Sequence, residues 1–185
     1  GVLMALLRRE KTGRADYIDI SMQDCLMSWL VNVVGPVFGE DRDLVLENER
    51  GFGGNAFYNI YECADGRHLT LGGSELKFAK NLLEALDRPD LVALCKLPPG
   101  PGQEPVRKFL RETFMGEPLA HWESVLAPLD VCWAPVRTLK EALRTEQIRE
   151  RGMRHDVEQQ GFGGGRVSLL GLPIRFQDEP GRIDA

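Results

Sequence analysis

The sequence lacks any long, uninterrupted run of apolar residues. Its longest apolar stretch, Cys25–Phe38, is broken by polar residues and by Gly35-Pro36, whereas a membrane-spanning helix needs roughly 18 or more consecutive apolar residues. We therefore expect no membrane span. Because glycine and proline interrupt helices, the stretch predicts a buried helix that ends near Gly35-Pro36.

Basic residues are not in excess either. Lys and Arg number 23 against 28 Asp and Glu, which gives a formal net charge of −5, and the basic residues are scattered along the chain. Proteins that bind a nucleic-acid backbone usually concentrate positive charge on one face. We therefore expect no nucleic-acid partner.

Sequence patterns for metal sites and disulfides are missing as well. The three histidines are not at metal-ligand spacing, and the four cysteines form no CxxC pair. This argues against a zinc site, and we expect no bound metal. Because Cys25, Cys95 and Cys132 have apolar neighbours, reduced thiols in the core of a cytoplasmic protein are favoured over disulfides.

The chain also lacks a polar or signal-like leader. It begins at Gly1 and opens directly into an apolar helical pattern at Val2, Leu3, Leu6 and Leu7. A natural N-terminus usually carries a start residue and some leading segment. We expect this chain to begin inside a larger protein.

The first forty residues predict a helix, a strand and a second helix. The first helix should end at Gly13, which suits the left-handed cap, and residues 17–21 are rich in β-branched and aromatic side chains typical of a strand. The apolar helix should then begin near Met22. This order is typical of an α/β layer, in which helices cover a sheet.

A charged and glycine-rich segment follows, and it predicts a domain boundary within residues 39–54. Beyond it, residues 57–63 and 68–71 read as a hairpin because Asp65-Gly66 readily adopts positive φ angles. Ser74 is a candidate N-cap for the next helix.

The remaining elements follow from helical periodicity and from glycine and proline breaks. Further helices are expected over residues 90–97, 106–114, 119–126 and 138–150, a strand over 131–134, and a hairpin of strands 154–159 and 166–170 around a turn at 161–165.

No complete catalytic motif is present, and Glu75 is the leading candidate for chemistry. It follows Gly72-Gly73-Ser74 at the start of a helix, where free N–H groups and the helix dipole favour a negative charge. One interpretation is simply an acidic helix start. The other is a carboxylate that takes or returns a proton at a substrate carbon, because glycines such as Gly72 and Gly73 let a ligand approach the backbone.

Gly51, Gly53 and Gly54 form a second candidate site. They can be a flexible connection between domains, or a loop that closes over a reactive intermediate and excludes water. The histidines and Cys132 are weaker candidates, since no partner base lies beside that thiol in the sequence.

Taken in order, several segments resemble the family III CoA-transferases, a group that includes the α-methylacyl-CoA racemases. The resemblance rests on six ordered segments spread over most of the chain: Arg8–Met22, Gly53–Gly66, Gly72–Phe78, Trp122 with Asp130–Val136, Arg151–Met153 and Gly171–Ile174. Ala15 stands where the family usually has glycine, and Asn55-Ala56 replaces a small residue followed by proline.

The resemblance implies an α/β fold, of which this chain is the C-terminal part. Residues 1–45 would supply a helix, strand and helix of a large α/β domain, 46–54 a linker with the glycine loop, 55–140 a small α+β domain, and 141–185 the return to the large domain. It further implies an interlocked homodimer in the cytoplasm.

The resemblance also implies work on acyl-CoA thioesters, with coenzyme A as part of the substrate and no separate cofactor. Glu75 would correspond to the racemases' active-site glutamate, with Gly51, Gly53, Gly54, Gly72 and Gly73 near the substrate. The reaction would be either CoA transfer between carboxylic acids or inversion of a 2-methyl centre. The family's catalytic aspartate would precede this chain, so a non-catalytic module that folds and dimerises is the rival hypothesis.

Overall fold

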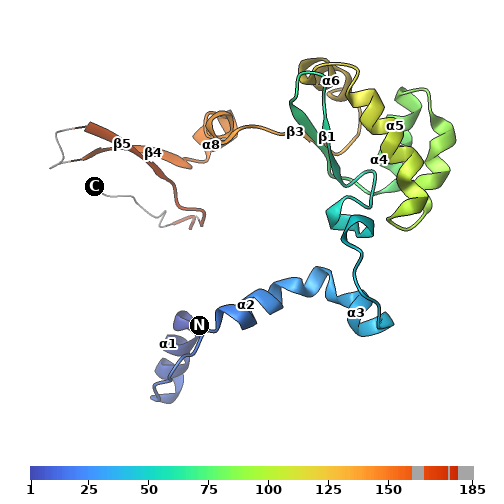
Figure 1. Cartoon of the computed structure of the whole chain (residues 1–185). Helices are drawn as coiled ribbons and strands as arrows, with labels where there is room; N and C mark the ends of the chain where they lie inside the picture. The colour runs from blue at the N-terminus through green and yellow to red at the C-terminus, as the bar shows by residue number, and fades with distance from the viewer. Residues whose placement is uncertain (160–164, 175, 179–185) are drawn as a thin grey trace.

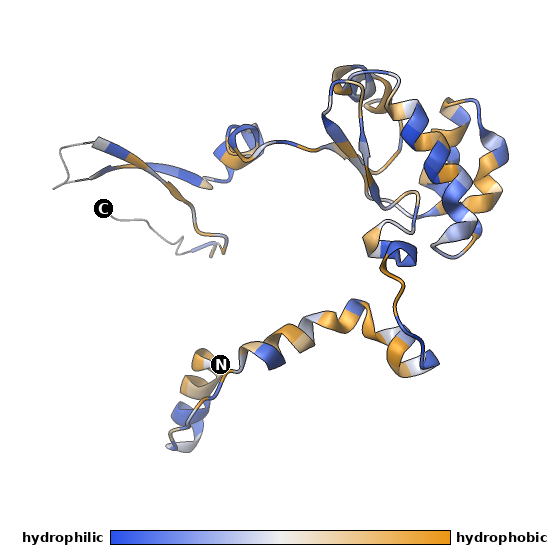
Figure 2. Cartoon of the chain, viewed as in Figure 1, coloured by the Kyte–Doolittle hydropathy of each residue, from blue (hydrophilic) through white to orange (hydrophobic). Residues whose placement is uncertain are grey.

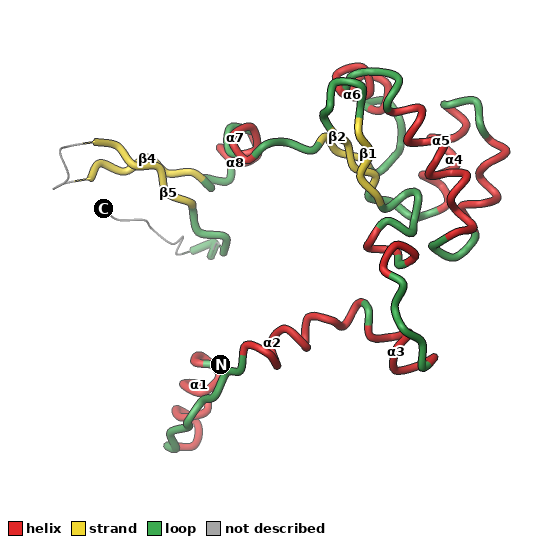
Figure 3. Tube along the Cα trace, in the orientation of Figure 1, coloured by secondary structure: helices red, strands yellow, loops and turns green. Residues whose placement is uncertain are grey.

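The computed structural model describes residues 1–159, 165–174 and 176–178. Figure 1 shows three parts along the chain: a helical arm (residues 1–48), a compact region (residues 54–136) and a C-terminal hairpin (residues 154–170). The secondary structure mixes helices with antiparallel strands, as the α/β assignment predicted (Figure 3).

The arm begins with helix α1 (Val2–Thr12), which ends as predicted at Gly13 with φ at 69°. The strand expected over residues 17–21 is wrong, because this segment has no regular structure. A strand needs a neighbouring strand to satisfy its backbone groups. None lies beside it in the described residues.

The apolar helix of the arm differs from its prediction in both length and burial. Helix α2 (Met22–Trp29) passes into a 3₁₀ turn (Leu30–Asn32), and α3 (Val34–Glu40) begins just beyond it. Pro36 lies in the first turn of α3, where the missing N–H costs nothing. The helix was expected to be buried, yet Trp29 and Phe38 are 82% and 81% exposed, and Figure 2 shows the apolar residues of the arm along isolated helices.

The compact region is built on a three-stranded antiparallel sheet. Strands β1 (Asn59–Glu62) and β2 (His68–Leu71) form the predicted hairpin, and β3 (Trp133–Pro135) pairs with the other edge of β2. The turn depends on Gly66, whose φ is 74°. The third strand is displaced by about two residues from the predicted position, since residues 130–132 are irregular.

Helices enclose the core of this region. They are α4 (Leu76–Ala85), a 3₁₀ helix (Pro89–Lys96), α5 (Glu104–Phe114) and α6 (Leu119–Leu126), with short 3₁₀ turns at Leu46–Asn48, Arg50–Phe52 and Pro101–Gln103. Helix α5 contacts β1 and α6 contacts β3. The predicted helices therefore exist close to their expected positions.

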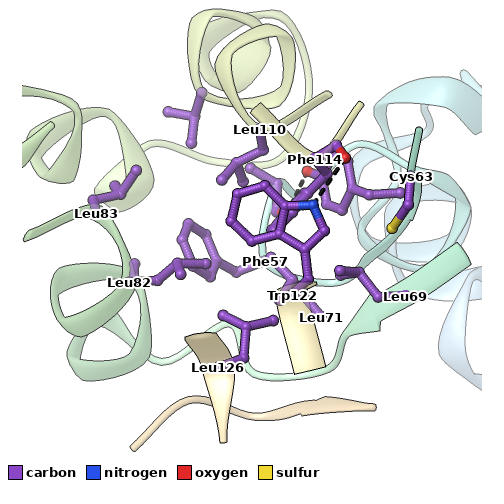
Figure 4. Packing of buried hydrophobic residues seen from close by; sticks show 14 of the residues in the cluster. Phe57, Cys63, Leu69, Leu71, Leu82, Leu83, Leu110, Phe114, Trp122 and Leu126 are labelled. Carbon is purple, nitrogen blue, oxygen red and sulfur yellow. Dashed lines mark hydrogen bonds between the residues drawn. The ribbon is translucent and has the colours of Figure 1, made fainter. Parts of the chain in front are cut away.

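The core itself is centred on aromatic side chains (Figure 4). The Trp122 indole packs edge-on against Phe114 with ring centroids 5.0 Å apart, and its N–H donates to the Phe114 carbonyl at 2.9 Å. The Tyr61 hydroxyl donates to the Ala56 carbonyl at 2.7 Å, and burial raises the pKa of Tyr61. Both of these buried polar groups therefore have a partner, which keeps their desolvation cost low.

The C-terminal part begins with the predicted capping box, in which Thr138 and Glu141 exchange hydrogen bonds. The single helix expected from Thr138 to Glu150 is instead two, α7 (Leu139–Ala142) and α8 (Glu146–Glu150), because a new N-terminus forms at Thr145. Strands β4 (Arg154–Gln159) and β5 (Gly165–Leu170) form the predicted antiparallel hairpin. Residues 161–164 of its expected turn lie outside the described residues.

The cysteine prediction is only partly correct. All four thiols are free, Cys63 is buried and Cys95 is partly buried, but Cys25 and Cys132 are exposed. Burial raises the pKa of the Cys95 thiol to about 11. Cys25 is exposed because the arm that carries it has no core.

Candidate functional site

A glycine turn connects the arm to the compact region. Its 3₁₀ turn, Arg50–Phe52, ends at Gly53, whose φ of 104° is readily adopted only by glycine. Gly51, in contrast, has open space around its Cα. Backbone therefore lies exposed at this turn, where a ligand could approach it.

A cavity of about 300 Å³ lies between this turn and the hairpin. Gly51 and Gly53 line one side, while the other comes from β1 and β2 and from Gly72 just after β2. Three of the five candidate glycines thus meet at one cavity, although Gly51 and Gly72 are far apart in the sequence.

Gly54 has a different environment from its two neighbours. It is buried. Its carbonyl accepts hydrogen bonds from the Gly100 N–H at 2.9 Å and from the Arg107 guanidinium. A Cβ atom at Gly54 would lie 2.3 Å from the Asn48 carbonyl oxygen. The structure therefore gives this glycine a packing role and does not place it at the cavity.

Gly73 is likewise packed rather than open. A Cβ atom there would lie 2.4 Å from the Phe78 ring and 2.7 Å from Cys132 Cβ. The adjacent Gly72 N–H donates to the Cys132 carbonyl at 2.8 Å. Gly73 therefore lets the end of β2 pass close to the segment before β3, and Gly72 is left at the cavity.

Ser74 does not cap α4 as predicted. The N-cap is Glu75, with no side-chain capping bond, because the Ser74 hydroxyl instead accepts hydrogen bonds from Arg50 Nε at 3.1 Å and Nη2 at 2.8 Å. The Glu75 side chain is exposed and has no salt-bridge partner among the residues that the structure describes. It does not line the 300 Å³ cavity, but its neighbour Ser74 is tied to the glycine turn.

Arg50 is the functional candidate that the sequence did not reveal. Its guanidinium lies over the Tyr58 ring, 4.2 Å from the centroid, while bonding to Ser74. A second cavity, of about 450 Å³, lies beside it and is also lined by Trp29, Val33 and Phe52. In the sequence, Arg50 looked like part of a charged linker, and the only available signal was its position directly before the glycines.

A second arginine anchors the other end of the turn. Arg107 is almost fully buried, bonds to the Gly54 and Gly100 carbonyls, and pairs with Glu104. The hydrogen bonds of Arg111 and Arg107 to Glu104 lower the pKa of that carboxyl. The glycine turn is therefore held at both ends while Gly51 between them stays open.

The arrangement combines exposed backbone, the Arg50 guanidinium and the Glu49 carboxylate around two adjoining cavities, and Glu75 lines neither of them. Such a site suits a ligand with both apolar and anionic parts. No cluster of side chains able to hold a metal ion occurs in residues 1–159, 165–174 and 176–178. In the same residues, no helix is long and apolar enough to cross a bilayer.

The model of CoA-transferase family III matches residues 1–185. The chain is 27% identical to human alpha-methylacyl-CoA racemase over 182 residues, which cover 92% of this chain and 44% of the racemase. It is also 27% identical to succinyl-CoA:mesaconate CoA-transferase of Haloarcula hispanica over 191 residues, covering 96% of this chain and 44% of the transferase.

Solved structures share the fold. The crystal structure of a CaiB/BaiF family protein from Brucella suis superimposes with a TM-score of 0.69 at 21% identity, covering 97% of this chain and 46% of that one. The chain thus spans less than half the length of these relatives.

Proposed function

This chain belongs to CoA-transferase family III, and from that premise we propose that the protein processes acyl-CoA thioesters. The observation that supports the proposal most is the bond between Arg50 and Ser74. It ties the start of α4, which carries Glu75, to the glycine turn beside the cavity.

We propose Glu75 as an acid/base group. A carboxylate near the thioester could remove the proton at carbon 2, leaving an enolate, and a proton returned to the other face would invert that centre. The exposed backbone at Gly51, Gly53 and Gly72 offers a surface against which the thioester can lie. CoA transfer between carboxylic acids is the other reaction of this class, and for it Glu75 should matter less.

We further propose that the protein is a cytoplasmic homodimer that needs no cofactor beyond its thioester substrate. The exposed apolar residues of the arm support an assembly of this kind. The division into residues 1–45 and 141–185 of a large domain and 55–140 of a small one stays a prediction. Light scattering of the purified chain would measure its oligomeric state.

The test is an assay of the chain with a 2-methylacyl-CoA in heavy water, following exchange of the proton at carbon 2 by NMR. Glu75→Gln should slow exchange by about 10²- to 10⁴-fold. Glu84→Gln is the matched control, since Glu84 lies on the same helix and its one salt-bridge partner among the described residues is Lys80.

A parallel assay follows transfer of CoA from one acyl-CoA to free carboxylic acids. Transfer that survives Glu75→Gln would assign the protein to the transferase branch. If the chain catalyses neither proton exchange nor CoA transfer, that result would support the rival hypothesis of a non-catalytic module.

A further inference from the structure

The contact between Arg50 and Ser74 competes with the capping of helix α4. The first N–H groups of a helix have no partner within the helix, and a serine placed directly before the first turn usually accepts a hydrogen bond from one of them. In this chain the Ser74 hydroxyl accepts from Arg50 Nε at 3.1 Å and from Nη2 at 2.8 Å instead. The N-cap position therefore falls to Glu75, whose side chain makes no capping bond.

The Arg50 side chain is held in the orientation that reaches Ser74. Its guanidinium lies over the Tyr58 ring, 4.2 Å from the centroid, and it stays charged at all physiological pH values. The carboxylate next to it in the sequence, Glu49, is bonded to Arg42 at 3.2 Å. The contact with Ser74 is therefore oriented by the aromatic ring, and the neighbouring carboxylate has an arginine of its own.

The direction of the Glu75 side chain depends on where α4 begins. As the N-cap, Glu75 has an extended backbone, with φ at −68° and ψ at 136°. If Ser74 were the N-cap, Glu75 would be the first helical residue, with ψ near about −42°. That change rotates the Cα–Cβ bond of Glu75 about its Cα–C bond by about half a turn, so the carboxylate would lie on a different side of the chain.

We propose that Arg50 is a positioning residue for Glu75. By occupying the Ser74 hydroxyl, it keeps α4 from starting one residue earlier, and it thereby sets the direction of the Glu75 carboxylate. Arg50 acts through Ser74 and not on the reacting atoms. The inference rests on the proposed function for the role of Glu75, and on the contact between Arg50 and Ser74 for the start of the helix.

The first experiment locates the start of α4 by NMR of the ¹³C,¹⁵N-labelled chain. In the unaltered chain, Glu75 should have the Cα and Cβ chemical shifts of an extended residue. Arg50→Met, which removes the donors and keeps an unbranched side chain, should move these shifts to helical values. Exchange of the Lys77 N–H with solvent should slow roughly fivefold, as expected when a Ser74 cap accepts from it. Extended shifts at Glu75 in Arg50→Met would overturn the inference.

Two further variants test whether capping by Ser74 is the cause. Arg50→Met combined with Ser74→Ala removes the alternative cap, so the Lys77 N–H should exchange as fast as in the unaltered chain. Arg50→Lys keeps a donor for the hydroxyl and should keep Glu75 mainly extended. Slow exchange that persists in the double variant would overturn the competition for Ser74.

Arg88→Met is the matched control. Arg88 also lies over an aromatic ring, that of Phe109 at 4.9 Å, and it pairs with Asp90. Its side chain makes no hydrogen bond to Ser74 or Glu75 in the part of the chain that the structure describes. The Glu75 shifts should therefore stay extended in Arg88→Met, and a change as large as that in Arg50→Met would overturn the inference.

The second experiment measures the consequence for chemistry, as exchange of the proton at carbon 2 of a 2-methylacyl-CoA. Arg50→Met should lower kcat about 10- to 100-fold with KM little changed, because a misplaced acid/base group loses rate and not affinity. Arg50→Lys should restore part of the rate. A raised KM with unchanged kcat would make Arg50 a binding residue and overturn the positioning role.

Failure of the inference and failure of the proposed function are distinguishable. If the unaltered chain exchanges no proton, the proposed function fails, and the chemical shifts of Glu75 alone decide whether Arg50 sets the start of α4. If exchange is as fast in Arg50→Met as in the unaltered chain although the helix start has moved, the positioning role is overturned and the proposed function stands.

Discussion

The arm and the compact region contain the same kinds of apolar side chain, but the compact region buries many of them and the arm exposes them. Every buried apolar residue that the structure describes lies between Ala56 and Leu126, whereas the arm exposes Leu3, Trp29 and Phe38. The difference lies in chain topology. In the compact region, strands and helices distant in sequence meet around one core, while α1, α2 and α3 lie outside that core (Figure 1).

The comparison shows that apolar periodicity predicts a helix but does not predict what covers it. Helices shorter than about 12 to 15 residues are marginally stable in isolation, and α2 and α3 have 8 and 7 residues. The arm therefore depends on packing that its own residues do not supply. The predictions below test how far the two regions differ in stability.

The largest effect is expected from a matched pair of phenylalanines. Phe114 is 0% exposed and Phe38 is 81% exposed, so Phe114→Ala removes a core side chain while Phe38→Ala removes one already in water. We expect Phe114→Ala to lower the free energy of unfolding by about 3–5 kcal/mol and Phe38→Ala by less than about 0.5 kcal/mol. Urea denaturation followed by circular dichroism measures both, and equal losses would mean that the arm has a core of its own.

An intermediate effect is expected where the two regions join. Gly54→Ala would place Cβ against the Asn48 carbonyl, whereas Gly51→Ala meets open space. We expect Gly54→Ala to cost roughly 1–3 kcal/mol of stability, as overpacking does. Gly51→Ala should change stability little and affect only ligand binding. If Gly54→Ala were neutral in thermal unfolding, the turn would not be fixed to the arm.

The smallest effect concerns pH. Arg111 and Arg107 lower the pKa of Glu104 below its usual value of 4.5, so the carboxylate contributes stability above that value and loses it as the pH falls through the folded-state pKa. Because Glu104 is about half exposed, its contribution should be about 1 kcal/mol or less.

The measurement compares unfolding of the unaltered chain and Glu104→Gln at pH 7 and at pH 3. The variant should be less stable at pH 7, and the gap should narrow at pH 3. Asp16→Asn, which removes the carboxylate paired with Arg8 in the arm, is the control. If the difference in unfolding free energy between the unaltered chain and Glu104→Gln were the same at both pH values, the ion pair would not be its cause.

Local signals in the sequence predicted most of the compact region. The Asp65-Gly66 turn located the hairpin, and the apolar periodicity located α4, α5 and α6. Their positions depend on contacts within a few residues. The missing strand at residues 17–21 and the exposure of α2 depend instead on neighbours from elsewhere, which no local pattern specifies.

The candidate site was predictable only in part. The glycines attracted attention because their backbone freedom is a property of the residue itself, but nothing in the sequence separated Gly51, at the cavity, from Gly54, which is packed against Asn48. Ser74 looked like a helix cap, and the competing partner was an arginine 24 residues away.

By itself, the sequence determined the family, the helices of the compact region and the two hairpins, because these follow from residue order and from short-range backbone preferences. Only the tertiary structure decided which apolar residues form a core and which glycines face a cavity. It also placed the Arg50 guanidinium over the Tyr58 ring, where its Nε and Nη2 groups donate to Ser74. Those outcomes depend on which segments far apart in the sequence pack together, because a residue becomes buried or hydrogen-bonded only through the neighbours that this packing supplies.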